Sequence, residues 1–153
     1  MHDIDISGIL FQFSRNRILW VTIIVWITGQ GIKITTNLLR GRRFNFRWVI
    51  RTGGMPSSHA AGVTALAVCC GMEYGFQSGM FALSSVFAMV TMFDAQGVRR
   101  SAGEQAEVLN KVIDDMYWHK KVDVGRIREF VGHSPMQVLA GLVLGMGMAI
   151  LLF

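Results

Sequence analysis

Histidine and serine occur together at two places where this sequence predicts the start of a helix. In Thr52-Gly-Gly-Met-Pro-Ser-Ser-His59, two glycines favour a turn, and Pro56 suits the first position of the helix that the following apolar run predicts. In Gly132-His-Ser-Pro, Ser134 fits the N-cap position and Pro135 the first helical position. Unpaired backbone N–H groups and the positive end of the helix dipole make such places suited to binding phosphate.

The pair His59 and His133, with basic residues expected on the same side, indicates phosphoryl transfer. A phosphate ester is anionic, so cations and helix starts must hold it and stabilise the charge of the transition state. One neutral histidine can attack phosphorus and form a phosphohistidine, while a second, protonated histidine donates to the leaving oxygen. This chemistry needs no metal, and we expect no metal site and no cofactor. The alternative interpretation is that each histidine lies at a helix start without a chemical role.

Composition indicates an integral membrane protein of one domain, residues 1–153. Hydrophobic residues make up 52% of the chain and charged residues 16%, and the mean hydropathy is +0.41. The formal charge of +5 lies in clusters between apolar runs, which fits membrane topology better than nucleic-acid binding, so we expect no nucleic-acid partner. The adjacent Cys69 and Cys70 lie inside an apolar run and are expected to pack between helices.

The apolar runs predict an all-α bundle of about four core transmembrane helices. They cover residues 18–34, 56–74, 80–93 and 134–153. Small residues recur at helical spacing in the second and fourth runs, which favours close helix packing. These residues are Ala61, Ala65, Cys69, Gly141 and Gly145.

Two further segments are expected at the membrane surface. Residues 1–17 combine apolar side chains with two arginines and predict an interfacial segment. Residues 94–133 form a polar loop, in which a capping box at 101–104 precedes an amphipathic helix. That helix is expected either to lie on the membrane face or to fold back over the site. Its apolar stripe is Val108, Leu109, Val112, Ile113 and Met116.

Charge predicts the orientation. Five arginines lie between residues 35 and 55, and this bias favours a cytoplasmic loop. Alternation of the spans then places Lys33, His59, Asp94 and His133 on the same side of the membrane. The alternative interpretation is that these arginines only set the membrane topology and bind no phosphate.

Three short patterns, in order, resemble those of a known superfamily. The chain has Lys33-x6-Arg40, then Pro56-Ser-Ser-His59, then an arginine upstream of His133. These are similar to the signatures Lys-x6-Arg-Pro, Pro-Ser-Gly-His and Ser-Arg-x5-His-x3-Asp of the type 2 phosphatidic acid phosphatase (PAP2) superfamily, which includes vanadium haloperoxidases. The stretch Asp94 to Arg100 resembles, more closely, the small bacterial divergent PAP2 group.

That resemblance implies a metal-independent phosphatase acting on a membrane lipid phosphate in the bacterial inner membrane. His133 is then the nucleophile and His59 the general acid. The groups implied or considered for phosphate or headgroup binding are Lys33, Arg40, Ser57, Ser58, Arg99, Arg100 and Arg128. Arg126 competes with Arg128, because neither has the signature spacing to His133.

The chain departs from the signatures at the position of the aspartate that would orient the nucleophilic histidine. Gln137 stands there, and a glutamine can orient a histidine but adds no charge. Asp94 is the candidate substitute, with pairing to an arginine or a helix-end role as the alternative. The departure also favours a second hypothesis, a non-catalytic protein that binds phospholipid or regulates a partner. The bilayer and a lipid phosphate are the expected partners, and a homo-oligomer is left open.

Overall fold

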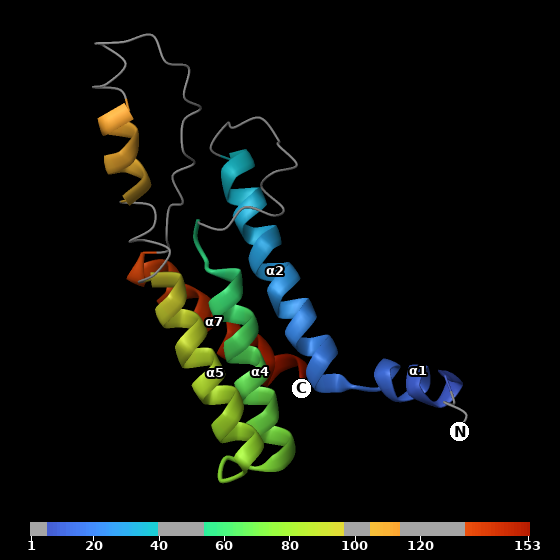
Figure 1. Cartoon of the computed structure of the whole chain (residues 1–153). Helices are drawn as coiled ribbons and strands as arrows, with labels where there is room; N and C mark the ends of the chain where they lie inside the picture. The colour runs from blue at the N-terminus through green and yellow to red at the C-terminus, as the bar shows by residue number, and fades with distance from the viewer. Residues whose placement is uncertain (1–5, 40–53, 97–104, 114–133) are drawn as a thin grey trace.

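The computed structural model describes residues 6–39, 54–96, 105–113 and 134–153, and these residues are helical apart from short turns (Figure 1). No strand occurs within them, which confirms the all-α prediction. The helices are α1 (Ile6–Ser14), α2 (Arg17–Leu39), α4 (Ser58–Tyr74), α5 (Gly79–Gln96), a helix over 105–113, and α7 (Pro135–Leu152).

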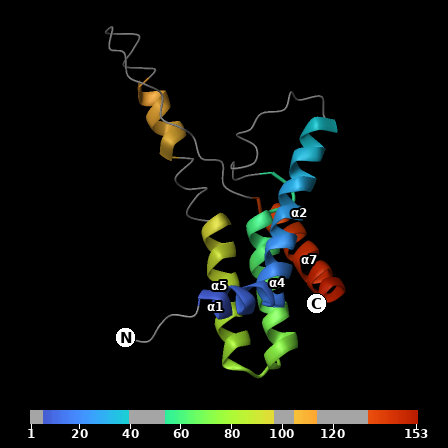
Figure 2. The same ribbon diagram turned by 90° about the vertical axis from the view of Figure 1, so that its right-hand side faces the viewer.

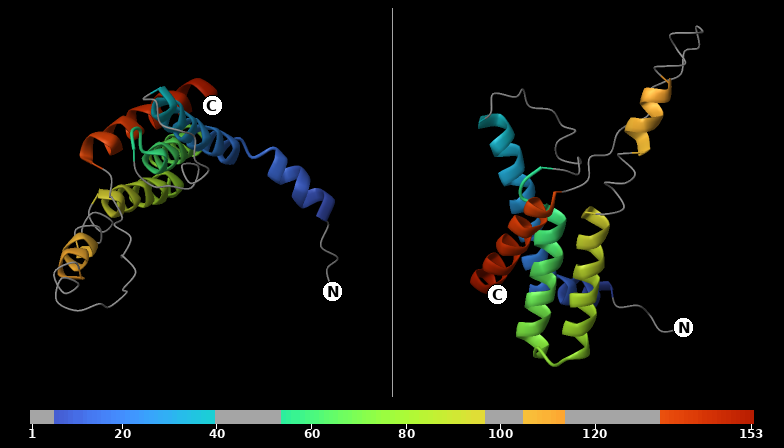
Figure 3. Two further views of the ribbon diagram at one scale, coloured as in Figure 1. Left: turned by 90° about the horizontal axis from the view of Figure 1, so that it is seen from above. Right: turned by 90° about the vertical axis from the view of Figure 1, so that its left-hand side faces the viewer.

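Helix α4 lies at the centre of the bundle and contacts α2, α5 and α7 (Figure 3). Its buried positions are occupied by small residues, so three neighbouring helices can approach its backbone closely. The core between α2, α4 and α7 is correspondingly made of small and β-branched side chains. Its buried members are Val21, Val25, Ala61, Ala65, Cys69 and Ala149.

Two glycines set the approach of α7 to α4. A Cβ atom added at Gly145 would lie 3.0 Å from the Cα atom of Ala61 and closer still to its carbonyl oxygen. One added at Gly141 would lie 2.9 Å from the Cβ of Ala60 and would overlap the carbonyl oxygen of Ser57. The structure therefore confirms that the predicted glycine face of the last helix is a packing face.

Three helices, α2, α5 and α7, are long and apolar enough to cross a membrane. The central helix α4 has 17 residues and is therefore roughly 26 Å long, close to the ~30 Å thickness of a bilayer's hydrocarbon core. Large apolar side chains on the outer faces of α5 and α7 are exposed, as expected for surfaces that contact lipid. They include Leu83, Val86, Val90, Phe93, Val143, Ile150 and Leu151.

Helix boundaries differ from the sequence prediction mainly in α2. The span expected to end at residue 34 continues as helix to Leu39, so Lys33 lies inside the helix and not at its end. The hydroxyl of Thr36 and the side-chain amide of Asn37 both donate to the carbonyl oxygen of Lys33, at 2.9 and 3.0 Å. Polar residues thereby bond to the helix backbone instead of ending it. Pro56 is also displaced from its expected place, since α4 begins at Ser58 after it.

Helix α1 points sideways away from the bundle, at about the level where α2 begins and α7 ends (Figures 1 and 2). The ring of Phe13 meets Trp20 edge to face at 5.9 Å, and the indole N–H of Trp20 donates to the carbonyl oxygen of Ser14 at 3.1 Å. The Arg17 guanidinium donates to the carbonyl oxygen of Phe153 and lies over its ring. These contacts join the starts and ends of three helices at this level.

The helix over 105–113 stands apart from the four packed helices in Figure 1 and is not folded back over the site. Val108, Leu109 and Val112 of its expected apolar stripe are exposed. Glu107 and Lys111 form an ion pair at 2.9 Å. The hydrogen bond from Lys111 in this pair lowers the pKa of Glu107.

Candidate anion site at the start of helix α4

The start of α4 is built by two serines. Ser57 is the N-cap, and its hydroxyl accepts a hydrogen bond from the N–H of Ala60 at 3.3 Å. Ser58 is the first helical residue, and its side chain is fully buried. The Ser58 hydroxyl has no hydrogen-bond partner within the described ranges. A buried hydroxyl normally has a partner, so this one is available to a bound group.

The starts of α4 and α7 are joined through their backbones. The N–H of Ser57 donates to the carbonyl oxygen of Gln137 at 2.9 Å. Gly141 lies one turn further along α7, and its missing side chain leaves room for the Ser57 carbonyl group. Two positive helix-dipole ends therefore lie beside each other, which favours an anion there.

Lys33 reaches this place from α2. Its side chain is 4% exposed, and its ammonium donates to the amide oxygen of Gln30 at 2.9 Å. The stem of Lys33 lies against Gly54, where an added Cβ would be 3.1 Å from the lysine Cγ. Gly54 has a positive φ of 94°, a conformation suited to glycine, so the turn before α4 closes directly over the lysine.

Glycine also brings α2 against the serines. A Cβ atom added at Gly29 would lie 3.1 Å from the Cα and 3.2 Å from the Cβ of Ser58. Ser58 stands where the PAP2 signature has glycine, and the glycine on the neighbouring helix provides the space for its side chain. The register between α2 and α4 is thus fixed one turn from Lys33.

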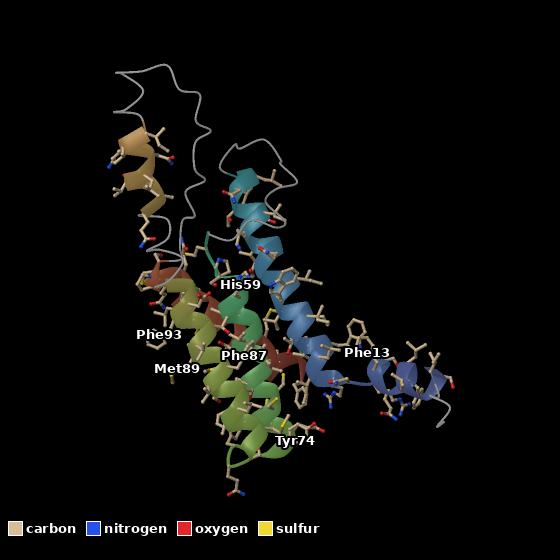
Figure 4. All side chains as sticks on the ribbon, in the orientation of Figure 1. Phe13, His59, Tyr74, Phe87, Met89 and Phe93 are labelled. Carbon is tan, nitrogen blue, oxygen red and sulfur yellow. The ribbon has the colours of Figure 1, made fainter. Side chains whose placement is uncertain are left out.

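His59 lies in the first turn of α4, at the same end of the bundle as Lys33 (Figure 4). Its side chain is half-buried, and its Nδ1 atom is shielded from solvent. Asp94 is half-buried in the last turn of α5, which ends on the same side of the bundle. The structure therefore brings Lys33, Ser57, Ser58 and His59 together and places Asp94 at the same end.

Several predicted site residues lie outside the described part of the chain. They are Arg40, Arg99, Arg100, Arg126, Arg128 and His133. Ser134, which follows His133, is described and is the N-cap of α7, and Pro135 is the first helical residue as predicted. Among the described residues, no group of three His, Cys, Asp or Glu side chains gathers in a way that could hold a metal.

The sequence prediction missed two residues of this site. Gln30 was not singled out, because a glutamine within an apolar run has no evident partner until the helix is built. Gly29 was missed for a similar reason, since its role is to leave space, whereas Gly54 belongs to the turn that was predicted before α4. The spacing of Gln30 three residues before Lys33 was the available signal, because such residues are neighbours on a helix.

Gln137 has a capping role that the sequence analysis did not predict. Its side-chain oxygen accepts a hydrogen bond from the backbone N–H of Ser134 at 3.2 Å. It therefore fixes the first turn of α7, as the last residue of a capping box does.

The fold and this site define an integral membrane helical bundle in which buried polar groups gather at one end. The family described as the Divergent PAP2 family matches residues 14–148, and the chain belongs to that family. It is 39% identical over 137 residues to "Uncharacterized membrane protein YuiD" of Bacillus subtilis (strain 168), an alignment that covers 82% of this chain and 87% of that protein. No solved structure matches the chain.

Proposed function

We propose that this protein is a metal-independent phosphatase that hydrolyses a membrane lipid phosphate. The observation that supports this most is the buried ammonium of Lys33, whose hydrogen-bond partner among the described residues is the neutral Gln30. A buried charge is costly unless it is compensated. A bound phosphate would compensate it, beside two helix starts and the hydroxyl of Ser58.

In the proposed reaction, a ring nitrogen of His133 attacks phosphorus, and the bond from phosphorus to the lipid oxygen breaks. His59 donates the proton that this leaving oxygen needs. Water then attacks the phosphohistidine and gives a proton to His59, and the bond from phosphorus to His133 breaks to release inorganic phosphate, which returns both histidines to their starting states. Lys33, Arg40 and Arg128 bind the phosphoryl oxygens and stabilise the charge of the transition state.

Secondary roles follow from position. Asp94 orients or charge-stabilises the nucleophilic histidine in place of the signature aspartate, while Arg99 and Arg100 bind phosphate or the lipid headgroup. The arginine-rich segment between residues 35 and 55 favours a site that faces the cytoplasm, in the inner membrane of a bacterium.

A second candidate is a non-catalytic phospholipid-binding or regulatory protein. Gln137 favours it, because this residue adds no charge where the superfamily has aspartate, and its side-chain oxygen bonds to the N–H of Ser134. An anion site without an oriented nucleophile would still hold a phosphate.

Phosphate release from purified protein distinguishes the two candidates. The substrates are phosphatidate, phosphatidylglycerophosphate and polyprenyl phosphate in mixed micelles, and the variants are His59→Ala and His133→Ala. The control is His119→Ala, which changes a histidine that the proposed reaction does not use. We expect release by the wild type and by the control, and a loss of about 10²-fold or more in either site variant. Binding of tungstate without release from any substrate would establish the binder instead.

A further inference from the structure

We propose that Gln30 is a positioning residue that holds the Lys33 ammonium in the anion site while leaving its charge uncompensated. The inference rests on the anion site of the proposed function, and it does not require turnover. It assigns a role to a residue outside the three signature segments.

The two side chains lie one turn apart on the same face of α2. The Nζ atom of Lys33 is 2.9 Å from the Oε1 atom of Gln30, and both residues are buried, at 4% and 7% exposure. A lysine side chain has many rotamers, and fixing it costs conformational entropy. Gln30 holds the ammonium, and the contact of Gly54 with the lysine stem limits the remaining freedom. The cation is therefore oriented before any anion binds.

The neutrality of the amide is the second part of the inference. An ammonium has three donors, and within the described residues Gln30 accepts one of them, so two are left for other acceptors. A carboxylate at the same place would accept the same hydrogen bond but would also neutralise the charge, and an incoming anion would then have to compete with it. An amide accepts the hydrogen bond and fixes the position of the ammonium, but it does not compete with an incoming anion for the charge.

The position of Gln30 connects this pair to the start of α4. Its neighbour in the chain, Gly29, lies against Ser58, so the segment of α2 that holds the ammonium is packed directly on the segment with the buried hydroxyl. A change in the charge at position 30 therefore acts within the site, whereas the same change at the opposite end of the bundle does not.

Binding of tungstate to the purified full-length chain in detergent, followed by calorimetry, tests this inference. Gln30→Glu keeps the size and hydrogen bond but adds a negative charge, and we expect its affinity for tungstate to fall by about 30-fold or more, as in Lys33→Met. Gln30→Met keeps the length and removes the acceptor, and we expect a loss of roughly fivefold. Gln77→Glu adds the same charge on the exposed α4–α5 turn and is expected to bind as the wild type does.

Thermal unfolding and size-exclusion profiles of each variant separate a binding effect from misfolding. If Gln30→Glu fails to fold, Gln30→Met decides the matter. Wild-type affinity in either folded variant, or a wild type that does not bind tungstate, overturns the inference. A wild type that binds tungstate as expected but releases no phosphate from any lipid contradicts the phosphatase proposal and leaves the role of Gln30 intact. If hydrolysis is found, Gln30→Met should raise KM more than it lowers kcat, since the lysine contacts the phosphate before and during the reaction.

Discussion

Lys33 continues a line of small and apolar residues along the face of α2 that meets α4. Val21, Val25, Gly29 and Lys33 succeed one another at helical spacing, and all are buried. Within one turn of this face, the packed apolar side chains give way to the lysine of the candidate site. Gly29 lies at this point and allows the serines of α4 to approach. Ionisable residues inside membrane segments are costly, so such a lysine indicates a functional site.

The hydroxyl of Ser58 gives a prediction at this scale. Ser58→Ala removes a buried group that has no partner within the described residues, so we expect stability to stay equal or rise by up to about 1 kcal/mol. Tungstate affinity is expected to fall severalfold, because a donor to the anion is lost. Thermal unfolding and calorimetry of the same preparations measure both effects, and a loss of stability without a loss of affinity would assign Ser58 to packing alone.

The residues of the site were predictable from sequence where chemistry fixed their type. Ser57, Ser58 and His59 were predicted because polar groups at a helix start have few other uses in an apolar chain, and Lys33 because its spacing to Arg40 resembles a signature. The capping role of Gln137 was not predicted, because an amide can orient a histidine or cap a helix, and sequence does not distinguish these uses. The structure describes the capping bond, and the proposed nucleophile His133 lies outside the described residues.

At the scale of helices, the main feature of α4 is the small size of its buried side chains. It contacts α2, α5 and α7 with small residues, and its start is linked to α7 by a backbone hydrogen bond. The helical spans and their small-residue faces were predictable because apolar runs and residue size are local properties. The end of α2 was not predictable in this way. The apolar run ends near residue 34, but the side chains of Thr36 and Asn37 bond to the helix backbone, and the helix continues.

The glycines of α7 give a matched pair of substitutions. Gly145→Ala places a methyl group against the Ala61 backbone, and we expect destabilisation by roughly 1–3 kcal/mol from overpacking. Gly147→Ala lies on the same helix with nothing within 4 Å of the added atom, and we expect no loss of stability. Thermal unfolding in detergent compares them, and equal effects would show that the α4–α7 approach is looser than the structure indicates.

Helix α1 has an apolar face that lies outside the bundle. Ile6, Ile9, Leu10 and Phe13 are exposed and recur at helical spacing, so we expect this face to lie in the membrane interface. A spin label at Leu10→Cys should show contact with acyl chains, while one at Gln12→Cys, about opposite on the helix, should show contact with water. Labels equally accessible to water would contradict an interfacial helix.

For the whole molecule, the bundle has two chemically different ends. Lys33, the start of α4 and the end of α5 lie at one end, and α1 with the Arg17–Phe153 contact lies at the other. The alternation of apolar runs predicted this arrangement of the described residues. Residues 40–53, 97–104 and 114–133 lie outside the described part of the chain, so the roles of Arg40, Arg99, Arg100, Arg126, Arg128 and His133 remain predictions.

Orientation in the membrane is tested with two introduced cysteines. Leu39→Cys lies at the site end and is 82% exposed in the wild type, and Gln77→Cys lies on the exposed turn at the other end. We expect a membrane-impermeant maleimide to label Gln77→Cys in intact spheroplasts and Leu39→Cys only after lysis. The buried Cys69 and Cys70 of the wild type serve as the unlabelled background. The reverse pattern would place the site on the outer face.

The hydrogen bond from Ser57 to Gln137 uses main-chain atoms only. An alanine scan would therefore leave it intact at both positions, because each variant keeps its amide group. Proline at position 57 deletes the donor, and an ester bond introduced between residues 56 and 57 does so without changing any side chain. Side-chain truncation at Ser57 or Gln137 would thus report the loss of a helix cap but not the contribution of this backbone bond, which joins the two helix starts.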